Sequence, residues 1–235
     1  MLGRSTDHQT GGELGNAAQH RLLYQLGIAA AAPRPESGAM AAIGDSAFEL
    51  DLYEVTNQQM AVFLNDAGNK RVKGVAHGEM TSAHVLIEEV AGIFRPKEGF
   101  ANHPSVEVSY AGARAYCEWA GKRLPTEAEW QLACEGPEGL TFAWGHHLRV
   151  AGPEALPRAN IFGAADGFLR TAPVGSFPHG RSAWGIYDMG GNVWEWAVSA
   201  EGESRLRGGS WVNGKLEVNS QKQLHISLVG QGCRV

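Results

Sequence analysis

The segment 182–196 combines three Trp, one Tyr and three Gly with the oxygen-bearing side chains of Asn192 and Glu195. Large rings beside glycines are typical of a buried, irregular segment in which backbones approach closely. Such a segment can turn amide, carboxylate and backbone oxygens toward a cation, and these are the ligands that calcium prefers. The alternative is a Trp-rich core hairpin whose polar residues cap turns, and composition alone favours it.

The thiols form no recognisable motif. The chain has three cysteines, Cys117, Cys134 and Cys233, and no CxxC pair of the kind typical of structural zinc. Three cysteines in 235 residues do not make a disulfide scaffold. One long-range disulfide with a remaining thiol and three buried thiols both stay open.

The histidines also lack the spacing of a metal site. His77, His84 and His103 stand in polar surroundings without an HxxxH or HxH pair. We therefore expect them on the surface.

Composition limits the class of protein. Apolar residues make up 43% and charged residues 19%, which suits a globular core and not a disordered chain. The 31 glycines are about twice the usual share, so we expect a loop-rich fold. A net charge of −5 without a basic run argues against a nucleic-acid partner. No apolar stretch approaches the ~18 residues that span a bilayer, so no membrane span is expected.

The first strong local patterns lie between residues 47 and 68. Alternation over 48–53 predicts a half-buried strand. Thr56 and Gln59 form a capping box, and Val55 with Met60 form a hydrophobic staple, so a helix is predicted over 57–67.

The next patterns predict a short strand and two helices. Weaker strands are expected over 85–90 and 93–94, and a further strand over 106–108. Ser109 is placed to cap a helix through Trp119, and a second capping box opens another helix at Thr126, with Trp130, Ala133 and Cys134 on one face. Lys122 and Arg123 are expected to meet Glu127 or Glu129.

The two ends of the chain differ from its middle. Residues 1–38 are predicted to be a partly helical arm and linker, and residues 39–235 a domain that ends in strand-like alternation. The apolar run 22–32 resembles a signal peptide weakly. Asp7 and Glu13 ahead of it argue against export, which slightly favours a cytoplasmic location.

Three blocks, in this order, resemble the formylglycine-generating enzyme family, the sulfatase-modifying-factor domain. They are 50–57, 103–130, and 185–196 followed by Arg-Gly-Gly-Ser-Trp at 207–211. The likeness runs from about residue 47 to the C-terminus. It implies an α+β, loop-rich fold related to C-type lectins, with little regular secondary structure.

The resemblance argues against the family's oxidase activity. Its sulfatase-activating members use O₂ and copper, held by two thiolates shortly after the Gly-Gly-Ser-aromatic motif. Those positions correspond to Asn213 and Val218 here, and neither can supply the soft ligand that Cu(I) requires. We expect no copper and no formylglycine generation. The resemblance also implies a Cys117–Cys233 disulfide and leaves Cys134, whose partner position holds Gln223, as a buried thiol.

Calcium is implied at two places. The first site would use the Asn160 and Asp166 side chains and backbone oxygens of Ile161 and Phe168; the second would use backbone oxygens of Gly190, Gly191 and Val193 and the Glu195 carboxylate. The alternatives are that Asp166 caps a turn and that Glu195 pairs with a buried arginine.

The C-terminal part offers a candidate ligand surface of adaptable hydrogen-bonding side chains with one rigid ring. Its residues are Ser210, Trp211, Asn213, Lys215, Glu217, Asn219, Gln221, Gln223 and His225. An ordinary solvated hairpin is the alternative.

We expect a calcium-stabilised, lectin-like module that binds a protein or small-molecule ligand, like the variable proteins of diversity-generating retroelements. The other expectation is an oxidoreductase or tailoring enzyme with a non-cysteine or partner-supplied metal centre. The family also includes pigment-maturation proteins of siderophore pathways, which lack the cysteine pair. Ergothioneine sulfoxide synthase is a third relative, but its three-histidine iron site cannot be completed by His8 and His20.

Overall fold

The protein is described from a computed structural model that covers residues 39–148, 157–163 and 166–213. All of these except Ala39 belong to one unit, Met40–Val235. The predicted arm, the strand-like C-terminus and the positions 215–225 of the candidate ligand surface lie outside the described residues. None of the described helices is both long and apolar enough to cross a bilayer.

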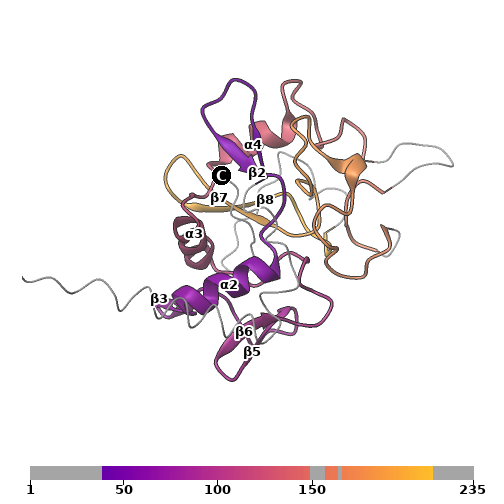
Figure 1. Ribbon diagram of the computed structural model, residues 1–235. Helices are drawn as coiled ribbons and strands as arrows, with labels where there is room; N and C mark the ends of the chain where they lie inside the picture. Colours follow the sequence, from indigo (N-terminus) through magenta and orange to yellow (C-terminus); the bar gives the residue numbers. More distant parts are fainter. Residues whose placement is uncertain (1–38, 149–156, 164–165, 214–235) are drawn as a thin grey trace, which may run out of the picture. The chain divides into compact units, whose positions relative to one another are not determined.

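The described chain consists of short antiparallel hairpins and three helices (Figure 1). The four hairpins are β1 Met40–Ala42 with β2 Glu49–Asp51, β3 Arg71–Val72 with β4 Val75–Ala76, β5 Ile87–Val90 with β6 Ile93–Pro96, and β7 Glu195–Val198 with β8 Ser204–Arg207. The helices are α2 Asn57–Ala67, α3 Tyr110–Trp119 and α4 Glu127–Glu135, and a 3₁₀ turn, η2, spans Pro178–Gly180. This arrangement is the loop-rich α+β class expected from the glycine content.

Helices begin where the sequence predicted them. The Thr56 hydroxyl accepts from the Gln59 amide, and the Gln59 side chain accepts from the Thr56 amide, so both halves of the first capping box form. Thr126 and Glu129 form the same reciprocal pair at the start of α4. The Ser109 hydroxyl caps α3 by accepting from the amide of Gly112. Each helix thus satisfies part of its orphan amide groups locally.

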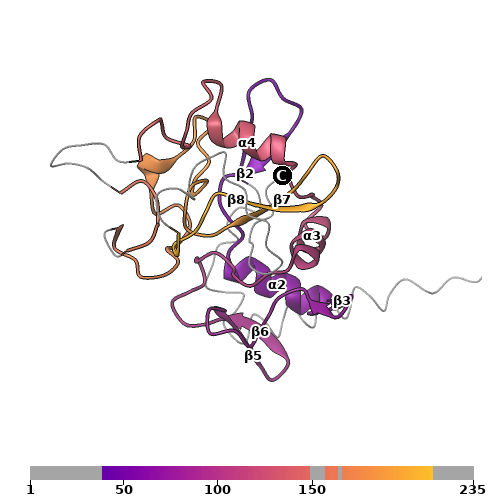
Figure 2. The same ribbon diagram turned by 180° about the vertical axis from the view of Figure 1, so that it is seen from behind.

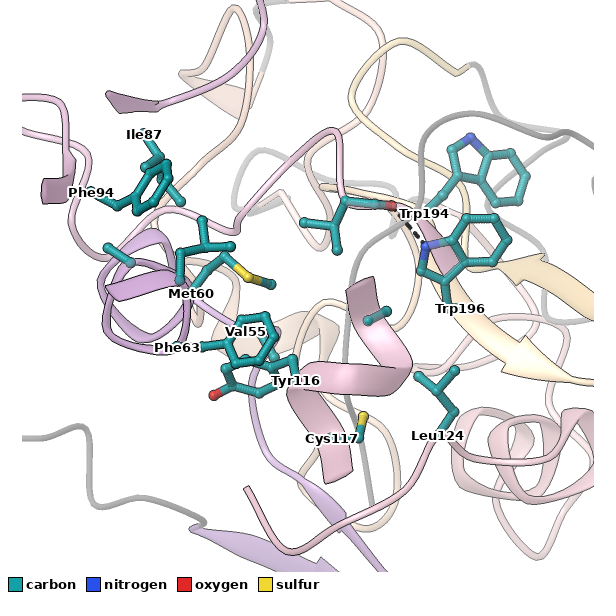
Figure 3. Packing of buried hydrophobic residues seen from close by; sticks show 14 of the residues in the cluster. Val55, Met60, Phe63, Ile87, Phe94, Tyr116, Cys117, Leu124, Trp194 and Trp196 are labelled. Carbon is teal, nitrogen blue, oxygen red and sulfur yellow. Dashed lines mark hydrogen bonds between the residues drawn. The ribbon is translucent and has the colours of Figure 1, made fainter. Parts of the chain in front are cut away.

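One predicted strand does not form. Residues 106–108 belong to no hairpin, and only Val108 makes an isolated bridge, to Gly78. The Val108 carbonyl instead accepts a 3.0 Å hydrogen bond from the indole of Trp196 (Figure 3). This segment is therefore held by a side chain of β7 and by the Glu79 amide, which donates to the Glu107 carbonyl at 2.9 Å, and not by a regular strand.

The larger apolar cluster lies between α2, α3, the β5–β6 hairpin and the rings of β7. Phe63 of α2 meets Tyr116 of α3 edge to face, with ring centroids 5.6 Å apart (Figure 3). Phe63 and Trp196 are almost fully buried, and truncating rings at such positions costs about 3–5 kcal/mol in general. The labelled members of the cluster are Val55, Met60, Phe63, Ile87, Phe94, Tyr116, Cys117, Leu124, Trp194 and Trp196.

A second cluster lies against α4, at the opposite end of the unit from the β5–β6 hairpin in both views (Figures 1 and 2). Trp130, Ala133 and Cys134 share the buried face of α4, as predicted, and pack with Leu50 of β2 and with Met189. The segment 186–208 touches both clusters, because Met189 belongs to the second and Trp194 and Trp196 to the first.

Candidate functional site

Asn192 connects four separate parts of the chain at the centre of the Trp-rich segment. Its backbone amide donates to the carbonyl of Asn160 at 2.8 Å, and its side-chain oxygen accepts from Asn160 Nδ2 at 3.0 Å and from the Ala172 amide at 2.9 Å. Its side-chain nitrogen donates to Glu54 Oε2 at 2.7 Å. Both Asn192 and Glu54 are buried. The amide oxygen of Asn192 is thus already used by two N–H donors.

The backbone at Asn192 is held in an uncommon conformation. Its φ is 59°, in the left-handed region that asparagine tolerates better than most residues. The preceding Gly191 has φ of 111°, and a Cβ there would lie 2.5 Å from the carbonyl oxygen of Asn160. Glycine is therefore required at 191 for the two segments to approach this closely.

The four residues of the first predicted calcium site lie in one loop. The Asp166 carboxylate accepts from the amides of Ile161 and Phe168, each at 3.0 Å. Asn160 Nδ2 donates to the carbonyl of Arg170 at 2.7 Å, while Asn160 Oδ1 is buried and has no hydrogen-bond partner among the described residues. A buried unpaired acceptor is costly, and a hard cation is one group that would satisfy it. Asp166 thus caps the turn, as the alternative expected, while the Asn160 oxygen and the carboxylate are donors of the type that calcium binds.

The residues of the second predicted site are all buried, and the Glu195 carboxylate lies among defined polar neighbours. Glu195 Oε2 accepts from the Trp130 indole at 2.7 Å. Glu195 lies directly opposite Arg207 in the β7–β8 hairpin, so the two side chains share a face. The Arg207 guanidinium stacks on the Trp130 ring at 5.1 Å and approaches Glu127 Oε1 at 3.6 Å. The carboxylate thus stands beside a buried arginine.

Burial lowers the pKa of the Arg207 guanidinium, and the Glu127 carboxylate opposes that effect.

Across the described part of the chain, no three His, Cys, Asp or Glu side chains gather as a metal-binding cluster. A cation in the 160–168 loop would accordingly bind mainly through carbonyl and amide oxygens.

The described part of the candidate ligand surface is a tight turn. Ser210 Oγ donates to Asn213 Oδ1 at 2.6 Å, and the Asn213 amide donates back to the Ser210 carbonyl at 2.9 Å. The Trp211 amide donates to the carbonyl of Asn192, and the Asn213 carbonyl accepts from the Phe162 amide, both at 2.9 Å. The turn is therefore anchored to Asn192 and to the predicted calcium loop.

Two histidines differ from the surface prediction. His77 is 5% exposed and stacks on Phe63, with ring centroids 5.6 Å apart, and its Nδ1 has no partner. Burial lowers the pKa of His77, and the charge of Lys70 adds to this. His103 is half-buried and hydrogen-bonded to Thr171, and burial lowers its pKa as well. Only His84 is exposed, as predicted, and its ring lies 6.0 Å from that of Trp211.

The cysteines decide between the two alternatives left by the sequence. Cys117 is part of a disulfide, and its expected partner, Cys233, lies outside the described residues. Cys134 takes part in no disulfide; its buried Sγ lies 3.8 Å from the Met189 carbonyl. The alternative of three thiols is wrong.

Sequence reasoning missed Glu54 and Arg170. Glu54 lies inside the block 50–57 and is buried. The one signal for its burial was its position between Tyr53 and Val55, directly before the hydrophobic staple. Arg170 is exposed and donates to the Ala83 carbonyl at 3.4 Å. No pattern in the sequence indicated this contact, because the two residues are 87 positions apart.

The chain matches one known protein family over most of its length. Residues 13–229 match the family described as the sulfatase-modifying factor enzyme 1-like domain. The chain belongs to this family. The resemblance inferred from the three sequence blocks is thereby confirmed.

Two curated relatives and one solved structure define the likeness. The formylglycine-generating enzyme of Mus musculus is 35% identical in an alignment that covers 63% of this chain and 48% of that protein. The inactive C-alpha-formylglycine-generating enzyme 2 of Bos taurus is 29% identical in an alignment that covers 86% of this chain and 79% of that protein. The structure of PvdO from Pseudomonas aeruginosa superposes with a TM-score of 0.57 at 26% identity, covering 79% of this chain and 76% of that one. The match thus spans about half the length of the mouse enzyme, and the family's fold, predicted from the sequence, is confirmed.

Proposed function

We propose that the protein is a ligand- or protein-binding module of the sulfatase-modifying factor family that does not generate formylglycine. The observation that carries the proposal is the state of Asn213, which stands at one of the two expected thiolate positions. Its carboxamide oxygen accepts from the Ser210 hydroxyl at 2.6 Å, and its backbone closes the same turn. A carboxamide committed to a turn offers Cu(I) no soft ligand.

One relative supports the absence of oxidase activity. The bovine protein that matches 86% of this chain is called an inactive formylglycine-generating enzyme. The family to which this chain belongs therefore includes a member described as inactive.

The surface beside Asn213 suits recognition. Trp211 is partly exposed, and Val212 is 53% exposed, so an apolar contact area stands next to hydrogen-bonding groups. Rigid aromatic rings beside small polar side chains bind ligands at a low entropic cost. This combination supports binding rather than a buried catalytic centre.

Calcium is proposed as the structural cofactor of the 160–168 loop. Asn160 and Asp166 would hold it with backbone oxygens of Ile161 and Phe168, and the ion would neutralise the carboxylate and satisfy the buried Asn160 oxygen. The amide of Phe162, inside this loop, donates to the Asn213 carbonyl. An ordered loop would therefore support the turn at 210–213, which we call the binding turn. The second proposed site, around Glu195, would have to share its carboxylate with the Trp130 indole.

The function is tested by Cu(I) titration together with a turnover assay. The purified full chain is given Cu(I), O₂ and a cysteine-containing sulfatase peptide, and the peptide mass is followed. We expect no stoichiometric Cu(I) binding and no conversion, whereas the double variant Asn213→Cys, Val218→Cys should gain Cu(I) binding. The single variants serve as matched controls, since one thiolate cannot form the pair. Conversion by the parent protein would overturn the proposal.

A further inference from the structure

Three residues from distant parts of the chain meet beside the binding turn. The His84 ring lies 6.0 Å from the Trp211 ring at an interplanar angle of 56°. The Arg170 guanidinium donates to the carbonyl of Ala83, the residue just before His84. Arg170, His84 and Trp211 therefore stand around one area of the surface.

Buried hydrogen bonds also link the two segments that carry Arg170 and Trp211. Asn160 Nδ2 donates both to the Arg170 carbonyl and to Asn192 Oδ1, and the Asn192 carbonyl accepts from the Trp211 amide. Because Asn160 and Asn192 are buried, the backbones that carry Arg170 and Trp211 are held to each other by fixed hydrogen bonds. Long side chains on such a support lose less freedom when they bind.

The charge of Arg170 is available to a ligand. Among residues 39–148, 157–163 and 166–213, no ion pair involves Arg170, and its one hydrogen bond, at 3.4 Å, occupies one of five N–H donors. Two carboxylates of the adjoining segments accept other hydrogen bonds: Asp166 accepts two backbone amides, and Glu107 accepts from Ser82 Oγ. A planar guanidinium fork matches a carboxylate in geometry and charge.

Exposed apolar side chains stand next to these elements in the chain. Leu169, which directly precedes Arg170, is 82% exposed, and Val212, which directly follows Trp211, is 53% exposed. Phe162 is 75% exposed, and its backbone amide donates to the Asn213 carbonyl. A cation among exposed rings and aliphatic groups calls for a ligand that is itself apolar and carries one negative charge.

We propose that Arg170, His84 and Trp211 form a subsite for an organic carboxylate joined to an aromatic or aliphatic group. The carboxylate binds Arg170, and the apolar group lies against Trp211 with His84 at its edge. This inference rests on the proposed binding function and specifies the chemistry of its ligand.

The test compares two probes that differ only in charge, N-acetyl-phenylalanine and its C-terminal amide. Each is titrated into the full chain by calorimetry, and the Trp211 indole N–H resonance is followed by NMR. The variant Trp211→Phe identifies that resonance among the seven indoles. We expect the acid to bind about tenfold more tightly than the amide, since one charge-assisted contact separates them, and both probes to shift the Trp211 signal.

Two variants test whether Arg170 causes the difference in affinity between the acid and the amide. Arg170→Gln should weaken binding of the acid about tenfold and leave the amide unchanged. Arg71→Gln is the matched control, because Arg71 is also exposed and also donates to a backbone carbonyl, that of Gly74 at 2.8 Å. Equal effects of the two substitutions would overturn the assignment.

The remaining outcomes separate this inference from the function on which it rests. If both probes bind equally and shift Trp211, the anionic subsite is refuted while the binding surface stands. If neither probe binds, the subsite is refuted as well, and the non-oxidase proposal is still decided by the Cu(I) titration. If the parent protein converts the sulfatase peptide, the function itself fails, whatever the probes do.

Discussion

Glu54 accepts a 2.7 Å hydrogen bond from the side-chain amide of Asn192, a residue 138 positions further along the chain, and both side chains are buried. The second oxygen of Glu54 accepts from the Val193 amide at 3.2 Å. A carboxylate just before α2 thereby holds the turn that connects the 160–168 loop to the turn at 210–213.

Replacing Glu54 should destabilise the whole unit. Glu54→Ala removes the acceptor of the Val193 amide and leaves the Asn192 side-chain nitrogen with only its 3.3 Å bond to the Ala172 carbonyl. This should lower the free energy of unfolding by about 3 kcal/mol. Glu54→Gln should cost less, because its carbonyl can still accept one of the two bonds. Denaturant unfolding measures both, with exposed Glu49→Gln on β2 as the control. A loss below about 1 kcal/mol for Glu54→Ala would show that the network is not important.

Adding a methyl group at Gly112 of α3 should destabilise the protein. Alanine ordinarily stabilises a helix by about 1 kcal/mol relative to glycine, but a Cβ at Gly112 would lie 2.1 Å from the carbonyl oxygen of His77. The clash should outweigh the propensity, so Gly112→Ala should lower the thermal midpoint. Arg114→Ala, at an exposed position of the same helix, should change it little. A higher midpoint for Gly112→Ala would contradict the close packing.

Acid should destabilise the protein partly through His77. Burial holds the pKa of His77 below its ordinary value of about 6.5, so the unfolded chain takes up a proton that the folded chain resists. The neutral His77 contributes fully above the unfolded pKa, and this contribution is lost as pH falls through that value toward the lower pKa of the folded state. His77→Phe, which can keep the ring against Phe63, should flatten the dependence.

The measurement for His77 is the denaturant midpoint at a series of pH values, with the parent protein in the same buffers as the reference. Some dependence should remain in the variant, because burial also lowers the pKa of His103. Identical slopes for parent and His77→Phe would exclude the assignment.

Chelation should weaken the protein if calcium occupies the 160–168 loop. A ligand at 100 times its Kd stabilises the folded state by about 2.7 kcal/mol, so EGTA should lower the melting temperature clearly. In Asp166→Asn the effect of EGTA should shrink, because the carboxylate is lost, whereas exposed Asp45→Asn should behave like the parent. Elemental analysis of protein purified without added metal accompanies the melts. Near-stoichiometric copper or iron would refute the non-oxidase proposal in favour of a redox centre.

Local signals in the sequence determined the helices. Thr56 with Gln59 and Thr126 with Glu129 are three residues apart, so each capping box forms from its own segment and needs no distant partner. The buried face of Trp130, Ala133 and Cys134 follows from helical periodicity in the same way. The family and its fold could be recognised because three long blocks survive in order.

The tertiary structure decided where long-range partners lie. Lys122 was expected to meet a carboxylate of α4, but it pairs with Asp51 of β2, 71 positions earlier, and only Arg123 meets Glu129. His77 is buried because α3 packs against its backbone at Gly112, which polar neighbours in the sequence do not indicate.

The candidate site depends on the same kind of long-range contact. Asn160, Asn192, Glu54 and the Trp211 turn come from four separated segments, and a hydrogen bond between such segments leaves no periodic trace in any of them. The sequence by itself determined the helix starts, the family and the absence of cysteine at positions 213 and 218. Only folding decided which buried polar groups meet, because burial forces each of them to find a partner wherever the chain brings one near.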